Sequence, residues 1–229
     1  MYNLNKAKLL DDDVYDKARS QGAVPARIYG NPKMHKVPRN TADPDGEARP
    51  RVPPLRPIVS SIGAYNYNLA KYLTGLLSPH VPTDHCATDS FTFVQDLHKV
   101  SSQNKFLVSF DVVSLFTNIP LRETINLAVE AIFANDSSIK MSRAQLKKLF
   151  YFATSESHFL YNGQYYDQID GVAMGSPLGP VLANLFMGYK EKIWLKRYKG
   201  PKVGFYRRYV DDIFVCLTRK RMHTNFLNI

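Results

Sequence analysis

The amino-acid sequence predicts an α+β fold in which helices cover one face of an antiparallel sheet. Three observations lead to this prediction: an apolar run at residues 106–110 that suits a buried strand, two apolar and aromatic runs near residues 203–210 and 213–217 in hairpin spacing, and helical periodicity between them. The chain has 229 residues, of which 45% are apolar, so it can bury a substantial core. We therefore expect a folded protein of one or two domains.

The N-terminal part of the chain is predicted to contain few regular elements. Residues 1–24 form a polar extension, to which we assign no chemistry. Eight of the fourteen prolines fall within residues 25–57, which limits that stretch to loops and short edge strands, with a turn at residues 43–46. A strand at Ile58-Val59 and a helix over residues 68–77 are expected to follow.

Helices and strands alternate in the middle of the chain. Pro120 suits a first helical turn, and the apolar stripe after it predicts a helix over residues 120–134. Ser142 and Gln145 form a capping box for a second helix. Asn162-Gly163 lies between two short aromatic runs, which is the pattern of a two-residue hairpin turn.

A long helix and a hairpin are predicted in the C-terminal part. Ser176-Pro177 can cap and begin the helix and Gly200-Pro201 stops it, which predicts a helix over residues 177–198. The hairpin runs through Asp211-Asp212, so both carboxylates are expected at its tip. We expect the two long helices to pack on one face of a sheet made of residues 106–111, 203–210 and 213–217.

Aspartates end two of the predicted buried strands, Asp111 after the first and Asp211-Asp212 at the later hairpin. An ionised carboxylate held away from water costs several kcal/mol unless a cationic partner is present. If the strands are neighbours, Asp111 and Asp211 repel each other, and Mg²⁺ relieves this because it prefers one or two carboxylates with waters and phosphates. Two such ions about 3.5 to 4 Å apart can catalyse in-line phosphoryl transfer. Taken alone, the Asp-Asp dipeptide is more typical of an ordinary hairpin turn.

The charge of the chain favours a partner that carries phosphates. Thirty Lys and Arg residues against twenty Asp and Glu give a net charge of +10. Residues 190–221 carry eleven basic and three acidic side chains, so the net charge of this segment is +8. A nucleic-acid path is one interpretation and a solvated helix face is the other. The residues proposed for such a path are Lys196, Arg197, Lys199, Arg207 and Arg208.

A nucleotide substrate would bring a triphosphate, which proteins bind mainly with Lys, Arg and metal ions. The candidates in this sequence are Arg56, Lys33 and Lys36. Residues 171–180 form a glycine-rich loop that runs into the predicted long helix, and Gly175 would permit close approach of a base pair or phosphate there. Exposed lysines and glycine-rich loops are also common without any such role.

Several other classes of protein do not fit the sequence. Cys86 and Cys216 are too few and too far apart for a disulfide framework or a zinc site, which indicates a reducing compartment. No stretch approaches the roughly 18 uninterrupted apolar residues of a membrane span, and no apolar N-terminal run precedes a cleavage site. We therefore expect a soluble, intracellular protein.

Five blocks of this sequence resemble a known enzyme family. Residues 109–120 (Ser-Phe-Asp-Val-Val-Ser-Leu-Phe-Thr-Asn-Ile-Pro), 171–180 (Gly-Val-Ala-Met-Gly-Ser-Pro-Leu-Gly-Pro) and 206–212 (Tyr-Arg-Arg-Tyr-Val-Asp-Asp) resemble the three central motifs of reverse transcriptases, in order and spacing. Residues 29–36 and 55–63 resemble the finger motifs of Penelope-like retroelements. Five ordered blocks leave little room for a chance match.

The resemblance implies a right-handed polymerase. Residues 25–104 would form the fingers and residues 105–229 a ferredoxin-like palm, with a fingers insertion near residues 136–168. The implied reaction is RNA-directed DNA synthesis, in which a primer 3′-hydroxyl attacks a deoxynucleoside triphosphate and pyrophosphate leaves. Its cofactors would be two Mg²⁺ ions, with Mn²⁺ as a possible substitute, and its partners an RNA template and a DNA primer, without a membrane or an obligate protein partner. A retroelement origin also implies a nuclear location.

The resemblance also implies roles for individual residues. By position, the metal ligands would be Asp111, Asp211, the weaker Asp212 and the carbonyl of Val112. Phe116 lies where related enzymes keep an aromatic ring beneath the sugar of the incoming nucleotide, and a ring there would exclude a 2′-hydroxyl. Met174, a nucleotide-binding candidate, stands where many relatives carry glutamine, so contacts of that glutamine do not transfer to this chain.

The sequence departs from the family at its end, and alternatives stay open. It stops at Ile229, before the helical thumb, and it contains no GIY-YIG endonuclease domain. A truncated copy of the element or a fragment of a longer protein would look like this. Without a thumb, we expect weaker binding of the primer-template, because phosphate contacts are lost. The alternatives are a non-catalytic nucleic-acid-binding remnant, an RNA-dependent RNA polymerase and a purely structural basic protein. Metal-dependent primer extension and nucleotide selection by a Phe116→Ala variant distinguish them.

Overall fold

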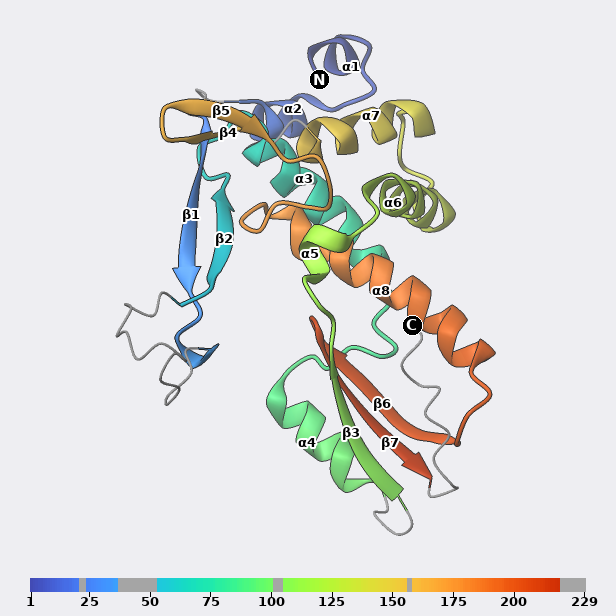
Figure 1. The fold of residues 1–229 in the computed structure, drawn as a ribbon. Helices are drawn as coiled ribbons and strands as arrows, with labels where there is room; N and C mark the ends of the chain where they lie inside the picture. Colours follow the sequence, from blue (N-terminus) through green and yellow to red (C-terminus); the bar gives the residue numbers. More distant parts are fainter. Residues whose placement is uncertain (21–23, 37–52, 101–104, 156–157, 219–229) are drawn as a thin grey trace, which may run out of the picture.

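The structure, a computed structural model, describes residues 1–20, 24–36, 53–100, 105–155 and 158–218 (Figure 1). The turn predicted at residues 43–46 and the basic residues 219–221 lie outside these ranges. Within them, no helix combines the length and the apolar character needed to cross a membrane. The elements in chain order are α1 (Tyr2–Lys6), α2 (Asp12–Ala18), β1 (Ala26–Pro32), η1 (Met34–Lys36), β2 (Leu55–Ser60), α3 (Tyr67–Leu77), η2 (Ser78–His80), α4 (Ser90–His98), β3 (Lys105–Asp111), α5 (Leu115–Asn118), α6 (Leu121–Asn135), α7 (Arg143–Thr154), β4 (His158–Tyr161), β5 (Gln164–Asp167), α8 (Leu178–Arg197), β6 (Val203–Tyr209) and β7 (Asp212–Thr218).

A three-stranded antiparallel sheet has the strand order β3-β7-β6. Its register pairs Phe110 with Ile213 and Asp111 with Asp212, so the end of β3 lies level with the start of β7. The strands begin and end within one residue of the predicted bounds. The prediction of an α+β fold with an antiparallel sheet is therefore confirmed.

Helices lie on both faces of this sheet (Figure 1). Phe93 of α4 makes edge-on contact with Phe214 of β7 on one face. Glu191 of α8 binds Tyr206 and Arg208 of β6 on the other. The long helix predicted over residues 177–198 thus packs on the sheet as expected. The prediction that the helix over residues 120–134 also packs on this sheet is wrong, because α6 packs against α3, α7 and α8, one layer farther from the sheet. The packing of α4 on the opposite face was not predicted.

The main hydrophobic core lies among α3, α6, α7 and α8. Its largest fully buried members recur at helical spacing within each element, and they include Leu73, Leu77, Ile125, Ile132, Leu146, Phe150, Leu178 and Leu182. Burying one such side chain stabilises a fold by about 1.5 to 3 kcal/mol. The helical layer therefore fixes α8, and α8 in turn supports one face of the three-stranded sheet.

A second sheet has four strands in the order β2-β1-β4-β5. β1 pairs with β2 antiparallel and with β4 parallel, so a hairpin from the middle of the chain extends the N-terminal strands. The predicted turn joins β4 to β5, and Asn162 and Gly163 have the positive φ angles, 48° and 76°, that a tight hairpin turn requires. A small core of Ala26, Val59, Ala64 and Ala173 lies beneath this sheet.

The predicted capping box begins α7. The Ser142 hydroxyl accepts from the Gln145 backbone N–H at 3.3 Å, and the Gln145 side chain accepts from the Ser142 N–H at 2.7 Å. Replacing Ser142 with alanine is expected to lower the free energy of unfolding by about 1 kcal/mol, because the backbone N–H of Gln145 loses its acceptor. Urea unfolding measures the loss, with Ser137→Ala in the exposed preceding loop as the control. Equal values for the two variants would contradict the prediction.

Candidate active site

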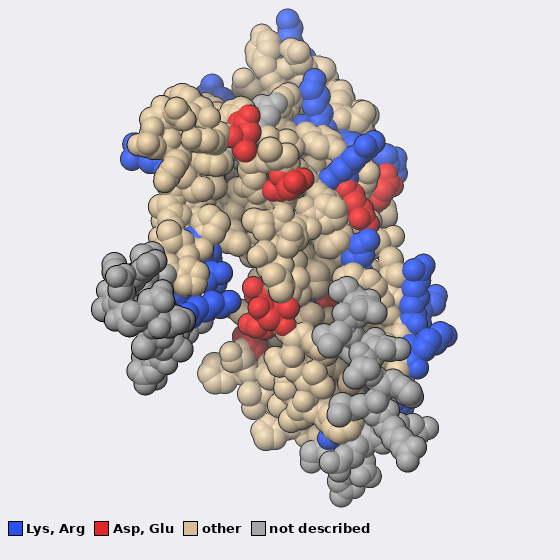
Figure 2. All heavy atoms as spheres, viewed as in Figure 1, with Lys and Arg blue, Asp and Glu red and all other residues tan. Residues whose placement is uncertain are grey.

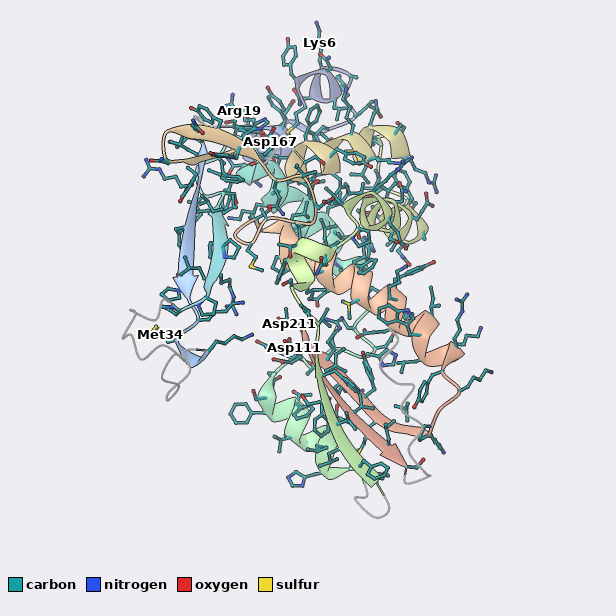
Figure 3. All side chains as sticks on the ribbon, in the orientation of Figure 1. Lys6, Arg19, Met34, Asp111, Asp167 and Asp211 are labelled. Carbon is teal, nitrogen blue, oxygen red and sulfur yellow. The ribbon has the colours of Figure 1, made fainter. Side chains whose placement is uncertain are left out.

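Asp111 and Asp211 lie next to each other at one end of the three-stranded sheet (Figure 3). Asp111 is the last residue of β3, and Asp211 lies in the turn between β6 and β7. The backbone N–H of Val112 donates to the carbonyl oxygen of Asp211 at 2.9 Å, which ties the two segments directly. Asp111 is also the register partner of Asp212. The four predicted metal-ligand positions are thus joined in two pairs, Val112 with Asp211 by a backbone hydrogen bond and Asp111 with Asp212 by strand pairing.

Both turns beside these aspartates contain a non-glycine residue in the left-handed region, Ser114 with φ 52° and Val210 with φ 55°. That conformation costs an L-residue roughly 1 to 2 kcal/mol and is unusual for a β-branched side chain. Such strain persists only where surrounding contacts hold it, and it clusters at functional sites. The hairpin also differs slightly from the prediction, because only Asp211 lies in the turn and Asp212 begins β7.

The described residues contain no group of three or more His, Cys, Asp or Glu side chains placed to hold a metal ion. The predicted set of Asp111, Asp211 and Asp212 therefore does not close into such a group by itself. Asp111 and Asp212 are exposed and Asp211 is half-buried, so water and substrate can reach them. Mg²⁺ usually takes one or two carboxylates and completes its shell with water and phosphate oxygens. The residues present fit this mode of binding.

Basic side chains face the acidic sheet end. Figure 2 shows Lys and Arg side chains beside β1 and β2 directed toward an acidic group across a hollow in the surface. The residues predicted to bind a triphosphate, Lys33, Lys36 and Arg56, belong to this part of the chain. Lys36 and Arg56 are exposed, and Lys33 is half-buried. Cations on one side of the hollow and carboxylates on the other suit a ligand that carries both phosphates and bound metal ions.

Two glycines in the loop over residues 171–180 are required by backbone packing. Gly171 has φ +69°, and a Cβ there would lie 2.4 Å from the carbonyl oxygen of Phe116. Gly175 has φ +119°, and its Cβ would lie 2.3 Å from the carbonyl oxygen of Val59. Neither position has room for a side chain. The contact with β2 accounts for glycine at position 175 without the predicted approach of a base pair or phosphate.

The same loop is hydrogen-bonded to α5 and to the four-stranded sheet. The backbone N–H of Val172 donates to the carbonyl of Phe116 in α5 at 2.8 Å, after the Asp111 turn. The N–H of Val59 in β2 donates to the carbonyl of Met174 at 2.8 Å. Met174 is therefore fixed through its backbone against the edge of the four-stranded sheet, and its side chain is half-buried.

The basic residues predicted to line a nucleic-acid path do not form one surface. Lys196, Arg197 and Lys199 surround a shallow depression at the C-terminal end of α8. Arg207 points to the α4 face, where it forms an ion pair with Asp96 at 3.0 Å. The side chain of Arg208 is 0% exposed, so the prediction that it contacts nucleic acid is wrong. A phosphate cannot reach that guanidinium while it is buried between the sheet and α8.

Sequence reasoning missed the polar side chains of α8 that bind Arg208. Glu191 is 1% exposed, and Asn184 is half-buried on the same helix face. One face of α8 contains Asn184, Gly188 and Glu191, at the helical spacing i, i+4, i+7. Gly188 on this face packs against Pro82, so the carboxylate of Glu191 lies on a face that contacts the rest of the protein. A charged residue on a buried face needs a partner of opposite charge. The position of Glu191 in the helical pattern was therefore the sequence signal that could have predicted a buried basic partner.

Most of the chain matches a known protein family. Residues 54–229 match the family described as reverse transcriptase (RNA-dependent DNA polymerase). The chain belongs to the reverse transcriptase family. The matched region contains the three-stranded sheet, the glycine-rich loop and both Asp111 and Asp211. Comparison with curated protein sequences gives no match.

Solved polymerase structures share the fold of this reverse transcriptase chain. Telomerase from Candida albicans in complex with the TWJ fragment of telomeric RNA aligns with a TM-score of 0.57 at 9% identity, over 96% of this chain and 41% of that one. Apo telomerase from Candida tropicalis, truncated from the C-terminal domain, aligns with a TM-score of 0.51 at 14% identity, over 95% and 48%. The RNA-dependent RNA polymerase of BmCPV in its quiescent state gives 0.53 at 11% identity, over 95% and 21%. The chain thus spans less than half the length of each of these proteins.

Proposed function

We propose that this chain provides the fingers and palm of an RNA-directed DNA polymerase, which adds deoxynucleotides to a primer 3′-hydroxyl. The observation that carries the proposal is the convergence of Asp111 and Asp211 at one sheet end, in a chain that belongs to the reverse transcriptase family. Paired carboxylates facing basic side chains across an open hollow suit phosphoryl transfer between polyanionic substrates.

The proposed palm is the region of residues 105–229 and the proposed fingers the region of residues 25–104. The pairing of β4 with β1 supports a fingers insertion near residues 136–168, because it joins that segment to the N-terminal strands. One helix modifies this division. α4 lies within the fingers range but packs on the three-stranded sheet through Phe93, so we count it with the palm.

The carboxylates of Asp111 and Asp211 would hold Mg²⁺ or Mn²⁺, with Asp212 and the carbonyl of Val112 as further ligands. Such ions, when bound, lower the pKa of the attacking hydroxyl and stabilise the leaving oxygen. The chain's own contribution is to fix the two carboxylate-bearing segments before substrate arrives. The 2.9 Å hydrogen bond from Val112 to Asp211 does this at the backbone, so little reorganisation is needed during the reaction.

Basic residues would bind the phosphates of the substrates. We assign Arg56, Lys33 and Lys36 to the triphosphate, because Arg56 lies in β2 and the two lysines directly follow β1, on the side of the hollow that faces the carboxylates. Met174 and Gly175 would border the nucleotide from the loop attached to β2. The depression formed by Lys196, Arg197 and Lys199 is remote from the carboxylates and would bind nucleic-acid backbone by charge alone. Arg207, already paired with Asp96, is left out of this assignment.

Phe116 is proposed to select deoxynucleotides. Its half-buried ring lies in α5, after the turn that follows Asp111, and its Cδ1 atom would be 3.7 Å from a Cβ at Gly179 in α8. Replacing Phe116 with alanine is expected to raise the ratio of ribonucleotide to deoxynucleotide incorporation by at least about tenfold, because the 2′-hydroxyl would no longer meet the ring. Single-nucleotide extension measures the ratio, with Phe152→Ala in the distant helix α7 as the control. An unchanged ratio would remove Phe116 from this role.

The origin of the chain is a separate proposal. Residues 29–36 and 55–63 support a Penelope-like retroelement, since they resemble the finger motifs of that group. A nuclear location follows from such an origin. Expression of a tagged chain with fluorescence imaging tests the location directly, and exclusion of the protein from nuclei would count against it.

Primer extension tests the proposed function. The assay uses a labelled DNA primer on an RNA template with deoxynucleotides and Mg²⁺, at high protein concentration because the chain spans only part of its structural relatives. We expect extension by the wild type and by Asp13→Asn, a control at an exposed position of α2, and none by Asp111→Asn. Extension that survives Asp111→Asn, or its absence in the wild type, would contradict the proposal.

The structural similarity to the BmCPV RNA-dependent RNA polymerase supports a second candidate function, RNA synthesis. Ribonucleotides in place of deoxynucleotides in the same assay distinguish the two. Preferential use of ribonucleotides by the wild type would favour the second candidate, and preferential use of deoxynucleotides the first.

A further inference from the structure

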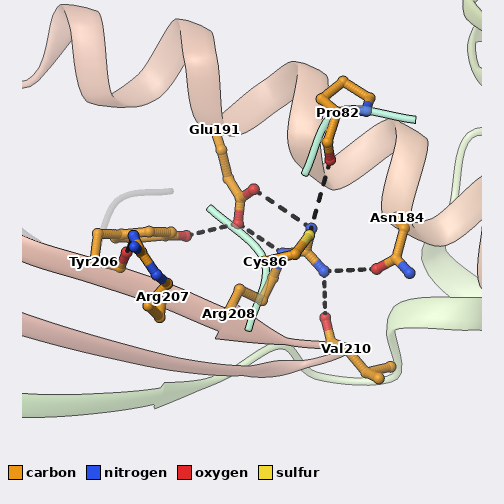
Figure 4. A network of polar contacts seen from close by, with 8 residues as sticks. All are labelled: Pro82, Cys86, Asn184, Glu191, Tyr206, Arg207, Arg208 and Val210. Carbon is orange, nitrogen blue, oxygen red and sulfur yellow. Dashed lines mark hydrogen bonds and ion pairs between the residues drawn. The ribbon is translucent and has the colours of Figure 1, made fainter. Parts of the chain in front are cut away.

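The guanidinium group of Arg208 is fully buried, and each of its N–H groups has an acceptor (Figure 4). Nε donates to Oε1 of Glu191 at 2.6 Å, and Nη2 donates to Oε2 of the same residue and to Sγ of Cys86, both at 3.4 Å. Nη1 donates to Oδ1 of Asn184 and to the carbonyl oxygen of Val210, both at 2.9 Å. Because guanidinium has five N–H donors, its position and its plane are both fixed by these acceptors.

The partner carboxylate is equally constrained. Glu191 is 1% exposed, and its Oε1 atom also accepts from the hydroxyl of Tyr206 at 2.9 Å. Burial, followed by the charge of Glu191, raises the pKa of Tyr206 far above its usual range, so this hydroxyl remains a donor. A buried ion pair of this kind is often no more stabilising than two apolar side chains of similar volume. Stability alone is therefore a weak reason for its presence, and a role in fixing one conformation is a stronger one.

The backbone of Arg208 is anchored as well. Its N–H donates to the carbonyl of His85 at 2.8 Å, and its carbonyl accepts from the N–H of Ala87 at 2.8 Å. The segment that leads into α4 thus pairs with β6 beside the hairpin. Arg208 is therefore contacted by three separate parts of the chain: the segment before α4, the helix α8 and the sheet. These contacts fix its position.

From this fixed group, one hydrogen bond reaches the strained turn. Val210, with φ 55°, directly precedes Asp211, and its carbonyl is the acceptor of Arg208 Nη1. A hydrogen bond from a charged donor contributes about 1.5 to 3 kcal/mol, which is comparable to the roughly 1 to 2 kcal/mol cost of the left-handed conformation. We infer that Arg208 is a positioning residue, which keeps the turn in the conformation that places Asp211 beside Asp111 for metal binding. The inference rests on the proposed function, because it assigns Arg208 a role in the same site.

Two variants are designed to remove the contact to Val210 without leaving Glu191 as an unpaired buried charge. Arg208→Lys keeps a cation for Glu191, but a single ammonium cannot also span to the Val210 carbonyl. Arg208→Met with Glu191→Met replaces the whole ion pair with apolar side chains, which avoids an unpaired buried charge. The control is Arg143→Met with Glu130→Met, an exposed ion pair between α6 and α7. Thermal unfolding establishes which variants are folded.

The measurement is the dissociation constant for Mn²⁺, determined by electron paramagnetic resonance on the whole chain without nucleic acid. We expect both Arg208 variants to weaken Mn²⁺ binding at least tenfold and the control pair to leave it unchanged. A purely structural role would lower the unfolding temperature without changing Mn²⁺ affinity in the folded protein. Folded Arg208 variants with wild-type affinity would therefore overturn the inference.

Two further variants keep the test decisive. If both Arg208 variants unfold, Asn184→Ala, which leaves the ion pair intact and removes one acceptor of Nη1, is expected to weaken Mn²⁺ binding two- to fivefold. Unchanged affinity in that variant would then overturn the inference. Asp111→Asn separates this inference from the proposed function. If wild-type Mn²⁺ binding does not depend on Asp111, the metal site itself is wrong, and the positioning role fails with it.

Discussion

Replacing Asp211 with asparagine is expected to reduce the rate of primer extension at least about 10³-fold, because metal ions supply several kcal/mol of transition-state stabilisation and each 1.4 kcal/mol corresponds to about tenfold in rate. The amide keeps the size of the side chain and the backbone bond to Val112. It removes the negative charge that would hold the ion. Initial rates under single-turnover conditions, with Mg²⁺ varied over a wide range, measure the effect.

Asp212→Asn is the matched comparison. Asp212 begins β7 instead of lying in the turn, and the family resemblance assigns it the weaker role, so we expect a loss of only about tenfold. Both variants are expected to unfold at the wild-type temperature, since the two side chains are at least partly exposed. A larger loss for Asp212→Asn than for Asp211→Asn would reverse the assignment of ligands.

Gly171→Ala is expected to lower the free energy of unfolding by about 3 kcal/mol or more. The left-handed φ of +69° costs alanine roughly 1 to 2 kcal/mol. In addition, the new Cβ would lie 2.4 Å from the carbonyl oxygen of Phe116, and relieving such overlap typically costs about 1 to 3 kcal/mol. The backbone that must move belongs to α5, which follows the Asp111 turn, so catalysis should be lost together with stability. Urea unfolding of purified protein measures the change.

Gly163→Ala separates backbone strain from overlap. Gly163 has nearly the same φ, +76°, but a Cβ there would meet nothing within 4 Å. The Gly163→Ala variant should therefore lose only the cost of the left-handed conformation, about 1 to 2 kcal/mol of its free energy of unfolding. Gly175→Ala should resemble Gly171→Ala, because its Cβ would lie 2.3 Å from the Val59 carbonyl oxygen. If all three variants lose the same stability, close packing is not what requires glycine in the loop.

Elements with strong local signals could be predicted from the sequence. The capping box at Ser142, the Asn162-Gly163 turn and the long helix α8 were each specified by residues within a few positions of one another. The bounds of the three-stranded sheet followed from its apolar runs, and the aspartates at its end followed from the cost of placing charge there. The convergence of Asp111 and Asp211 was therefore predictable once the strands were assumed to be neighbours.

Features that depend on long-range pairing could not be predicted in this way. The parallel pairing of β1 with β4 joins segments separated by more than a hundred residues, and neither strand carries a signal for its partner. Arg208 looked like one more residue of a basic cluster, because its buried partner Glu191 lies on a different element. The reason for glycine at position 175 was likewise invisible without Val59 beside it.

The most direct test of the central claim is a crystal structure of the chain with Mn²⁺, in which the anomalous signal locates the ion. The account predicts a peak about 2.0 to 2.3 Å from carboxylate oxygens of both Asp111 and Asp211, with water completing the shell. The peak should disappear in crystals of Asp111→Asn. A strong Mn²⁺ peak elsewhere, with these two carboxylates turned into separate regions of solvent, would contradict the account.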